Sequence, residues 1–211
     1  MHQTLRALES QRYPHYEVIV VANDCSDDTA AVARNHCDRL IVISRKGISL
    51  ARNIGARLAC GEILLFLDAD TLLESNALMI VARDFTREYS AGTLKARPDP
   101  ARWFYCLLYF FKNLMHWSRI HKGSVGVILC WKDYFEAAGG FDERLHVMEN
   151  SALIKNAQRF GNYCFIRQTV ATTSMRRYEK RGFYRTVALW IKLWLHSLAN
   201  DLHGRQYETV R

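Results

Sequence analysis

The sequence is poor in the residues that separate domains. Only three of its 211 residues are proline, and no stretch rich in proline, glycine or serine could serve as a linker. No internal repeat divides the chain either. Because a chain of this length can enclose one sizeable core, we expect a single domain over residues 1–211.

The sequence also lacks a long apolar run and paired cysteine motifs. Its longest aromatic and aliphatic run, residues 103–111, ends at Lys112 and is much shorter than the roughly 20 residues that a membrane-spanning helix needs. The six cysteines form no CxxC pair and stand mostly in apolar runs, which predicts buried, reduced thiols. No secretory signal opens the sequence, so we expect a cytoplasmic protein.

Acidic residues are scarce in the second half of the sequence. Residues 1–100 contain 12 Lys/Arg and 13 Asp/Glu, whereas residues 101–211 contain 17 and 8, which together give the formal net charge of +8. A basic surplus of this kind fits nucleic acid, an anionic membrane surface or a phosphorylated substrate. Charge alone does not choose among these partners.

Short apolar runs alternate with helical patterns in the first hundred residues. The runs at 16–21, 39–43 and 62–67 are typical of buried parallel strands, and helices are expected between them with Asp27 and Ser49 as N-caps. This alternation predicts an α/β fold with a doubly wound, mostly parallel sheet. Ligands bind such sheets at the carboxyl ends of the strands.

The second half is less regular. We expect helices near 101–117, 131–138, 150–160 and 181–199, and strands near 125–130 and 163–171. We interpret residues 1–100 as a nucleotide-binding half and residues 101–211 as an acceptor-side half with a C-terminal amphipathic helix. Nothing before residue 16 has strand character, so the sheet is expected to lack its usual opening strand, as in a shortened gene product.

Two carboxylates stand one residue apart where the strand at 62–67 ends. Asp68 and Asp70 repel each other, so a cation between them or full solvation is required. A carboxylate at a strand end can hold Mg²⁺ or Mn²⁺ without filling the coordination sphere. The alternative is a pair of exposed carboxylates that cap a helix.

Four segments occur in the order expected of family 2 glycosyltransferases, which they resemble. They are SQRYPHYEVIVVANDCSDDTAAVA, GISLARNIGARLACGEILLFLDADT, GGFDERLHVMENSALIKNAQRFG and TSMRRYEKRGFYR. The resemblance implies the GT-A fold, a nucleotide-diphosphate sugar as donor, Mn²⁺ or Mg²⁺ as cofactor, and transfer that usually inverts the anomeric carbon. It implies a glycan or lipid-linked acceptor and no nucleic acid partner.

The same resemblance implies roles for individual residues. Asp70 is expected to bind the metal, and Asp68 the donor ribose or the metal through water. Asp24 would accept a hydrogen bond from the nucleotide base, although its segment is also typical of a turn. Diphosphate contacts are expected from a basic group that could equally be a solvated surface: Arg45, Lys46, Arg52, Arg176 and Arg177.

One position departs from the family pattern. Members usually end the third segment in Glu-Asp, with the Asp as the general base, but this chain has Glu149 and Asn150. An amide cannot accept the proton, so Glu149 becomes the candidate catalytic base. An ordinary carboxylate at a helix start is the alternative.

Apolar residues recur at helical spacing near the C-terminus. Phe183, Val187, Trp190, Trp194 and Leu198 form a stripe that is most often core but would also suit peripheral contact with the inner face of a membrane. Other classes of protein remain open. They are a nucleotide-sugar-binding domain without turnover, a nucleotidyltransferase, which would release pyrophosphate, and a nucleic-acid binder, whose affinity would fall steeply with salt.

Overall fold

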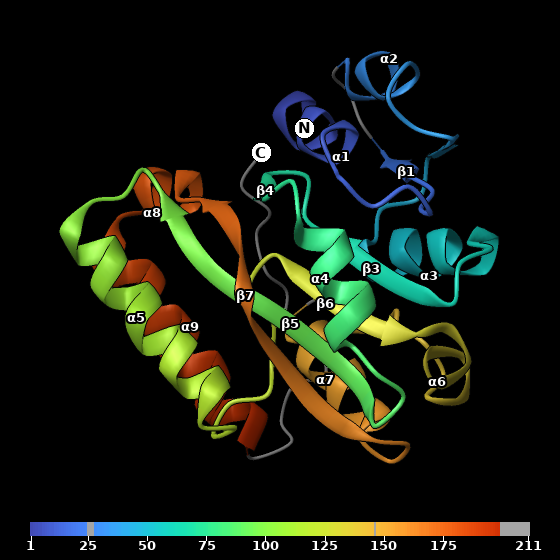
Figure 1. Ribbon diagram of the computed structural model, residues 1–211. Helices are drawn as coiled ribbons and strands as arrows, with labels where there is room; N and C mark the ends of the chain where they lie inside the picture. Colours follow the sequence, from blue (N-terminus) through green and yellow to red (C-terminus); the bar gives the residue numbers. More distant parts are fainter. Residues whose placement is uncertain (25–27, 146, 199–211) are drawn as a thin grey trace.

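The protein is an α/β domain, seen here in a computed structural model that describes residues 1–24, 28–145 and 147–198, with side chains up to residue 193. Helices and strands alternate along the first part of the chain (Figure 1). The elements are α1 (His2–Glu9), β1 (Ile19–Asn23), α2 (Thr29–Ala33), β2 (Arg39–Ile43), α3 (Ile48–Leu58), β3 (Ile63–Leu67), β4 (Thr71–Leu73), α4 (Ala77–Asp84), β5 (Tyr89–Asp99), α5 (Trp103–Trp117), β6 (Val127–Trp131), α6 (Lys132–Ala137), α7 (Glu149–Ala157), β7 (Asn162–Ser174), α8 (Arg176–Arg181) and α9 (Phe183–Leu198).

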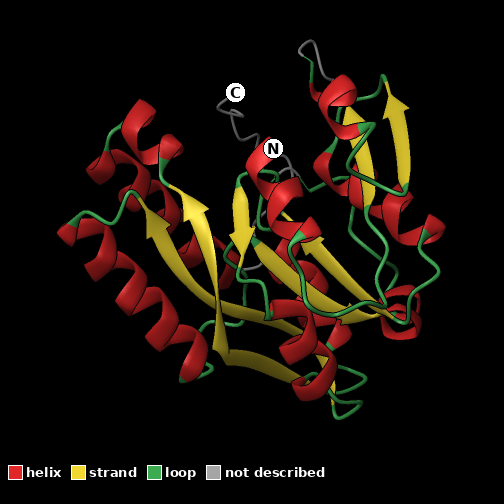
Figure 2. Cartoon of the chain, turned by 45° about the horizontal axis from the view of Figure 1, so that its top comes forward, coloured by secondary structure: helices red, strands yellow, loops and turns green. Residues whose placement is uncertain are grey.

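Five strands form the main sheet in the order β3-β6-β5-β7-β4 (Figure 2). The long β5 and β7 pair in parallel from Tyr89 to Asp99, and β1 pairs with β2 in parallel along its whole length. The antiparallel ladders of β6 with β5 and of β4 with β7 are short, and β3 pairs with β6 over five residues. Most paired residues are therefore in parallel ladders, as expected, although the main sheet is mixed.

The first two strands stand apart from the main sheet. β1 and β2 form a separate two-stranded sheet, whereas the sequence predicted one sheet containing the first three strands. Residues 1–18 contain α1 and no strand, which confirms that no strand precedes residue 16. Within the described residues, no ladder of hydrogen bonds joins β1 or β2 to β3.

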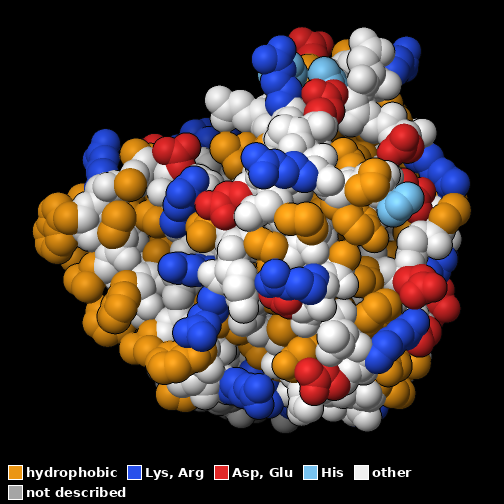
Figure 3. Space-filling model, in the orientation of Figure 1, with side chains coloured by type: hydrophobic (Ala, Val, Ile, Leu, Met, Phe, Trp, Pro, Cys, Tyr) orange, Lys and Arg blue, Asp and Glu red, His pale blue; other side chains and the backbone are white. Residues whose placement is uncertain are grey.

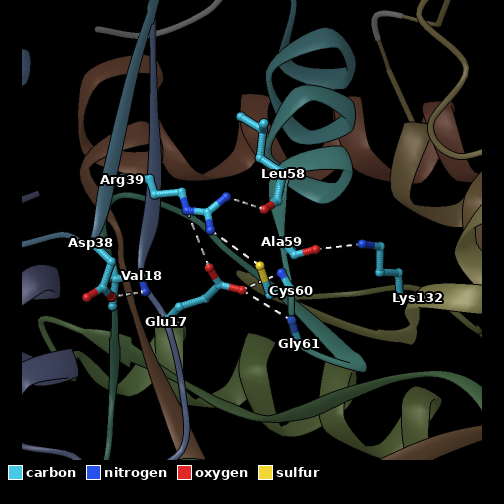
Figure 4. A network of polar contacts seen from close by, with 9 residues as sticks. All are labelled: Glu17, Val18, Asp38, Arg39, Leu58, Ala59, Cys60, Gly61 and Lys132. Atoms are coloured by element: carbon cyan, nitrogen blue, oxygen red, sulfur yellow. Dashed lines mark hydrogen bonds and ion pairs between the residues drawn. The ribbon is translucent and has the colours of Figure 1, made fainter.

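A polar network ties this two-stranded sheet to the rest of the domain (Figure 4). The Glu17 carboxylate accepts hydrogen bonds from the backbone N–H groups of Cys60 and Gly61, between α3 and β3. The Arg39 guanidinium donates to the Leu58 carbonyl at 2.8 Å. Lys132 donates to the Ala59 carbonyl from the other side. These bonds satisfy backbone groups at the end of α3 that would otherwise lack partners.

Side chains of the central strands alternate between two hydrophobic cores. In β6, Val127 and Leu129 pack in a core with α4, while Ile128 and Cys130 pack on the opposite face with α3, α6 and α7. This period of two follows from the geometry of a strand. A third core lies between α5, α8, α9 and the sheet, around Tyr105 and Met175. The main sheet is thus covered by helices on both faces.

Several local predictions differ from the structure. Gly47, rather than Ser49, occupies the N-cap position of α3, and Ser49 is buried within the helix. Asp27 lies outside the described residues. Cys130 and Cys164 are buried, as expected, but Cys60 and Cys106 are exposed; the described cysteines are all free. The sequence did not predict four elements, β4, α4, β5 and α8.

Candidate active site

Asp68 and Asp70 lie on the turn that connects β3 to β4. The Asp68 N–H donates to the Gly126 carbonyl at 2.9 Å, and the Thr71 N–H donates to the Asp68 carbonyl at 3.0 Å, which fixes the turn. The Thr4 hydroxyl of α1 donates to the Ala69 carbonyl between them at 2.8 Å. Both carboxylates remain about two-fifths exposed, so a ligand in solution can reach them.

The Arg52 guanidinium joins three elements of the predicted site. From α3 it donates to Asp68 Oδ1 at 2.8 Å, to Glu149 Oε1 at 3.1 Å and to Asn150 Oδ1 at 2.6 Å. The side chains of Arg52 and Glu149 are mostly buried. One cation therefore neutralises part of the charge of two carboxylates, and the segment of residues 139–150 is brought against the end of β3.

Asn53, a residue that the sequence analysis missed, holds this segment in place. Asn53 donates to the Phe141 carbonyl at 2.9 Å and accepts from the Phe141 N–H at 2.9 Å. A Cβ on Gly140 would come within 2.9 Å of the Asn53 amide oxygen, and Gly140 has a φ of 69°. The close approach and the left-handed backbone explain why glycine stands there. Asn53, adjacent to Arg52, carried no local signal of this role.

Asp70 faces the start of α8. Its Oδ2 lies 3.9 Å from Nη2 of Arg176. Partial burial and, next, the Asp68 carboxylate raise the pKa of Asp70, while Arg176 and Arg177 act to lower it. Arg177 also lies over the Trp190 ring, with 5.9 Å between the guanidinium carbon and the ring centroid. The structure thus places both predicted arginines in the electrostatic surroundings of Asp70.

Asp24 lies at the end of β1, in the two-stranded sheet. Its carboxylate is 3.3 Å from the Lys46 ammonium, and its N–H donates to the Ile43 carbonyl at 2.8 Å. Its φ of 46° is in the left-handed region that aspartate tolerates in turns. This position at a strand end agrees with the predicted turn.

A cavity of about 130 Å³ opens beside Asp70. Its lining includes Asp99 at the end of β5, Thr172 and Ser174 of β7, and Gln3 and Thr4 of α1. Asp99 was not predicted, because β5 was not predicted. Ligand pockets usually enclose about 300–1,000 Å³, so this cavity alone holds only part of a nucleotide-sized ligand.

The donor set at this turn fits a divalent cation held mainly by a substrate. No group of three or more His, Cys, Asp or Glu side chains gathers as a metal cage within residues 1–24, 28–145 and 147–198. Mg²⁺ characteristically takes only one or two carboxylates and completes its coordination with phosphate oxygens and water. The exposed Asp70, with its raised pKa, is a carboxylate whose charge such a cation would neutralise.

Comparison with known proteins identifies a family. The family model described as Glycosyl transferase family 2 matches residues 1–139. A poly-beta-1,6-N-acetyl-D-glucosamine synthase from Staphylococcus epidermidis is 28% identical over 103 residues, which are 46% of this chain and 25% of that protein. The chain thus spans about a quarter of this curated relative.

Solved glycosyltransferases share the fold. Residues 1–349 of TarS from S. aureus, in complex with UDP, have a TM-score of 0.64 and 17% identity over 82% of this chain and 56% of that chain. The mannosyltransferase PcManGT from Pyrobaculum calidifontis, in complex with GDP-Man and Mn²⁺, also has a TM-score of 0.64, with 21% identity over 80% of this chain and 51% of PcManGT. The chain spans about half of each structure.

Proposed function

Because this chain belongs to glycosyl transferase family 2, we propose that it transfers a sugar from a nucleotide-diphosphate sugar to an acceptor hydroxyl, with inversion at the anomeric carbon. The solved neighbours with the same fold were crystallised with UDP in one case and with GDP-Man and Mn²⁺ in another. These ligands support a nucleotide sugar as the donor class. A glycan or a lipid-linked sugar is the proposed acceptor class.

The Arg52 hydrogen bonds are the observation that carries the proposal. They join Asp68, on the donor side, to Glu149 at the start of α7, on the acceptor side, although 97 residues separate Arg52 from Glu149. A transfer reaction requires both substrates to meet within bonding distance. An exposed pair of helix-capping carboxylates, the alternative reading of this motif, would not explain a shared and largely buried guanidinium.

Each predicted residue takes a role in the donor complex. Asp24 binds the nucleotide base, and Asp68 binds the ribose. Arg52 orients the Asp68 carboxylate. Arg176 and Arg177 bind diphosphate oxygens. Guanidinium groups suit this last task because their planar donors match phosphate oxygens.

Asp70 would hold a divalent cation, Mn²⁺ or Mg²⁺. When bound, such a cation offsets the negative charge that develops on the leaving diphosphate. Arg176, 3.9 Å from Asp70, adds positive charge at the same place. In this proposal the chain supplies one metal-binding carboxylate, Asp70, and two guanidinium groups, those of Arg176 and Arg177, for the leaving group.

Glu149 serves as the general base in this proposal. The acceptor oxygen forms a bond to the anomeric carbon, the bond from that carbon to the phosphate oxygen breaks, and the hydroxyl proton passes to Glu149. The nucleoside diphosphate leaves with the electron pair of the broken bond. Arg52 engages Oε1 of Glu149, and the proton would be received at Oε2.

A nucleotide-sugar-binding protein without turnover is the second candidate. It is favoured by Asn150, whose amide oxygen accepts a short hydrogen bond from Arg52 where family members usually carry a base. The same donor binding is expected in this case, but without release of nucleoside diphosphate.

One experiment separates the two candidates. Purified protein is incubated with Mn²⁺ and a panel of nucleotide-diphosphate sugars, with and without glycan and lipid-linked acceptors, and both thermal stabilisation and released nucleoside diphosphate are measured. A ligand at about 100 times its dissociation constant adds about 2.7 kcal/mol of stability. Stabilisation with acceptor-dependent release supports transfer, stabilisation alone supports the binding protein, and no stabilisation by any donor contradicts both.

A further inference from the structure

Helix α5 exposes an apolar face where a surface helix normally has polar residues. Its outward positions are Trp103, Leu107, Phe110, Leu114 and Trp117, spaced so that they form one stripe, with exposed fractions between 39% and 77%. Figure 3 shows hydrophobic side chains gathered along the edge of the molecule where α5 lies in Figure 1. We refer to these five residues as the outer face of α5.

The opposite side of α5 is already packed. Tyr105 and Tyr109 are buried against Met175 and Tyr178. α5 is thus hydrophobic around most of its circumference, a pattern found in helices that are covered on all sides. Contiguous exposed apolar surface of this kind marks an interaction site.

The described part of the apolar stripe of α9 faces the core rather than the solvent, whereas a membrane contact would require it to be exposed. Phe183, Val187 and Trp190 of α9 pack toward the core that contains Tyr105, so the core interpretation holds for them. The side chains of Trp194 and Leu198 lie outside the described residues. The described part of α9 still exposes Tyr184 and Ile191, whereas α5 exposes a stripe of five apolar side chains.

Cations predominate around this face, although Glu179 of α8 lies 3.8 Å from Arg102. Residues 101–131 contain no Asp or Glu, but they contain Arg102, Arg119 and Lys122, all exposed. Arg167 of β7 lies over the ring of Trp117, with 5.5 Å between the guanidinium carbon and the ring centroid. Exposed aromatic residues with neighbouring cations match the interface between anionic headgroups and acyl chains.

We propose that the outer face of α5 docks the protein on an anionic membrane surface, with the helix axis parallel to the bilayer. At 15 residues the helix is about 22 Å long, shorter than the roughly 30 Å hydrocarbon core, so it lies in the interface rather than across it. No described helix is long and apolar enough to cross a bilayer. Trp103 and Trp117 mark the two ends of the contact.

A second copy of the chain fits this face less well. A symmetric dimer places the same patch on both partners, which would bring each copy's Arg102, Arg119 and Arg167 close to cations of the other copy. Like charges at an interface oppose association, whereas anionic headgroups attract the same cations.

Docking in this way would also orient the candidate active site. α5 begins four residues after Asp99, which lines the cavity beside Asp70. The cavity would then open near the lipid surface. Docking itself requires neither a donor nor catalysis, and its test is independent of sugar transfer.

The test measures co-sedimentation of the whole chain with vesicles of phosphatidylglycerol mixed with phosphatidylcholine, compared with pure phosphatidylcholine. We expect binding to the anionic vesicles at low salt, a decrease as salt screens the cations, and a blue shift of tryptophan fluorescence on binding. The double variant Leu107→Ser/Phe110→Ser should bind at least about tenfold more weakly, since two apolar side chains that leave water on docking are replaced by polar ones.

The matched control is Met79→Ser/Phe160→Ser, which removes two similarly exposed apolar side chains from other surfaces. It should bind like the unchanged protein, and thermal unfolding verifies that both variants are folded. No binding of the unchanged protein, equal binding to neutral vesicles, or equal weakening by both variants would overturn the proposal. A dimer that the α5 variant dissociates, without vesicle binding, would assign the face to a second copy instead.

Discussion

The Arg52 guanidinium donates a 2.6 Å hydrogen bond to the side-chain oxygen of Asn150. The amide nitrogen of Asn150 in turn donates to the Ser124 hydroxyl at 2.9 Å. An aspartate at this position would accept from both partners, but its carboxylate would pair with Arg52 and lie beside Glu149. The amide therefore lets Arg52 hold Asp68 and Glu149 without a third negative charge.

The first prediction concerns the proposed base. Glu149→Gln should lower acceptor-dependent turnover by about 10²- to 10⁴-fold, the usual contribution of a general base, while donor affinity stays nearly unchanged. Released nucleoside diphosphate and calorimetric donor titration measure the two effects. Glu136→Gln, at an exposed position on α6, is the control. If transfer is observed and Glu149→Gln leaves it intact, another residue is the base.

Asn150→Asp tests the same site from its neighbour. If the chain is active, a second carboxylate beside Glu149 should slow the reaction, because like charges raise one pKa and compete for Arg52. If the chain is inactive because position 150 lacks the aspartate usual in the family, Asn150→Asp should release nucleoside diphosphate from a donor. The unchanged protein would only bind that donor. The same product assay distinguishes these results, and an unchanged rate in an active enzyme would contradict the charge argument.

Arg52 should also stabilise the fold. Arg52→Met removes hydrogen bonds to two carboxylates and one amide, and charged hydrogen bonds contribute about 1.5–3 kcal/mol each when a partner is lost. Because the three bonds share one guanidinium and Asp68 is partly solvated, their contributions do not add, and the free energy of unfolding should fall by about 1.5–3 kcal/mol in total. Denaturant unfolding measures it. Arg57→Met on the exposed side of α3 should change stability little, and equal losses in both variants would argue against the bridging role.

Metal-dependent donor binding should depend on Asp70 more than on Asp68. Asp70→Asn should abolish the effect of Mn²⁺ on nucleoside diphosphate affinity, and Asp68→Asn should weaken it less. Protons compete with the metal for Asp70, and burial with the Asp68 charge raises its pKa. Metal affinity should therefore fall on acidification at a higher pH than for an ordinary aspartate, and Asp68→Asn should move that fall to lower pH. Calorimetric titration of nucleoside diphosphate with and without Mn²⁺ at a series of pH values measures these effects. If Mn²⁺ raises the affinity of Asp70→Asn as much as that of the unchanged protein, Asp70 is not the metal ligand.

Stability should fall in mild acid because of the buried His116 and its partly buried neighbour His121. Burial, followed by the neighbouring His121 and Lys112, lowers the pKa of His116 to about 3, and burial also lowers the pKa of His121. Unfolded histidines have a pKa of about 6.5, so the unfolded chain takes up protons that the folded chain excludes. The stabilisation is complete above that value and is lost as pH falls toward the folded pKa.

His116→Phe should flatten this pH dependence of the unfolding free energy, whatever its effect on stability at neutral pH. The aromatic replacement keeps a ring beside Phe165, which His116 stacks on at 5.8 Å. His15→Phe, at an exposed position, should leave the slope unchanged. Denaturant unfolding at a series of pH values provides the measurement, and an unaltered slope in His116→Phe would refute the account.

Sequence patterns alone predicted the α/β class, the first three strands, and the two carboxylates at the end of β3. They could do so because the relevant signals are local: strands alternate every two residues, helices repeat every 3.6, and Asp68 and Asp70 directly follow an apolar run. The ordered motifs also predicted the family that the comparison identified. The roles of all the site residues stay predictions: Asp24, Arg52, Asp68, Asp70, Glu149, Arg176 and Arg177.

Only the tertiary structure decided which residues meet. β5 carries Gly92 and Pro98 and lacks a continuous apolar run, and its strand state depends on β6 and β7 on either side. Arg52 finds Glu149 across 97 residues, and nothing in the local sequence encodes that contact. The outer face of α5 includes much of the longest apolar run of the sequence, but it has no covering element in the described structure. Partners distant along the chain determine these features, because pairing and burial are properties of the folded chain as a whole.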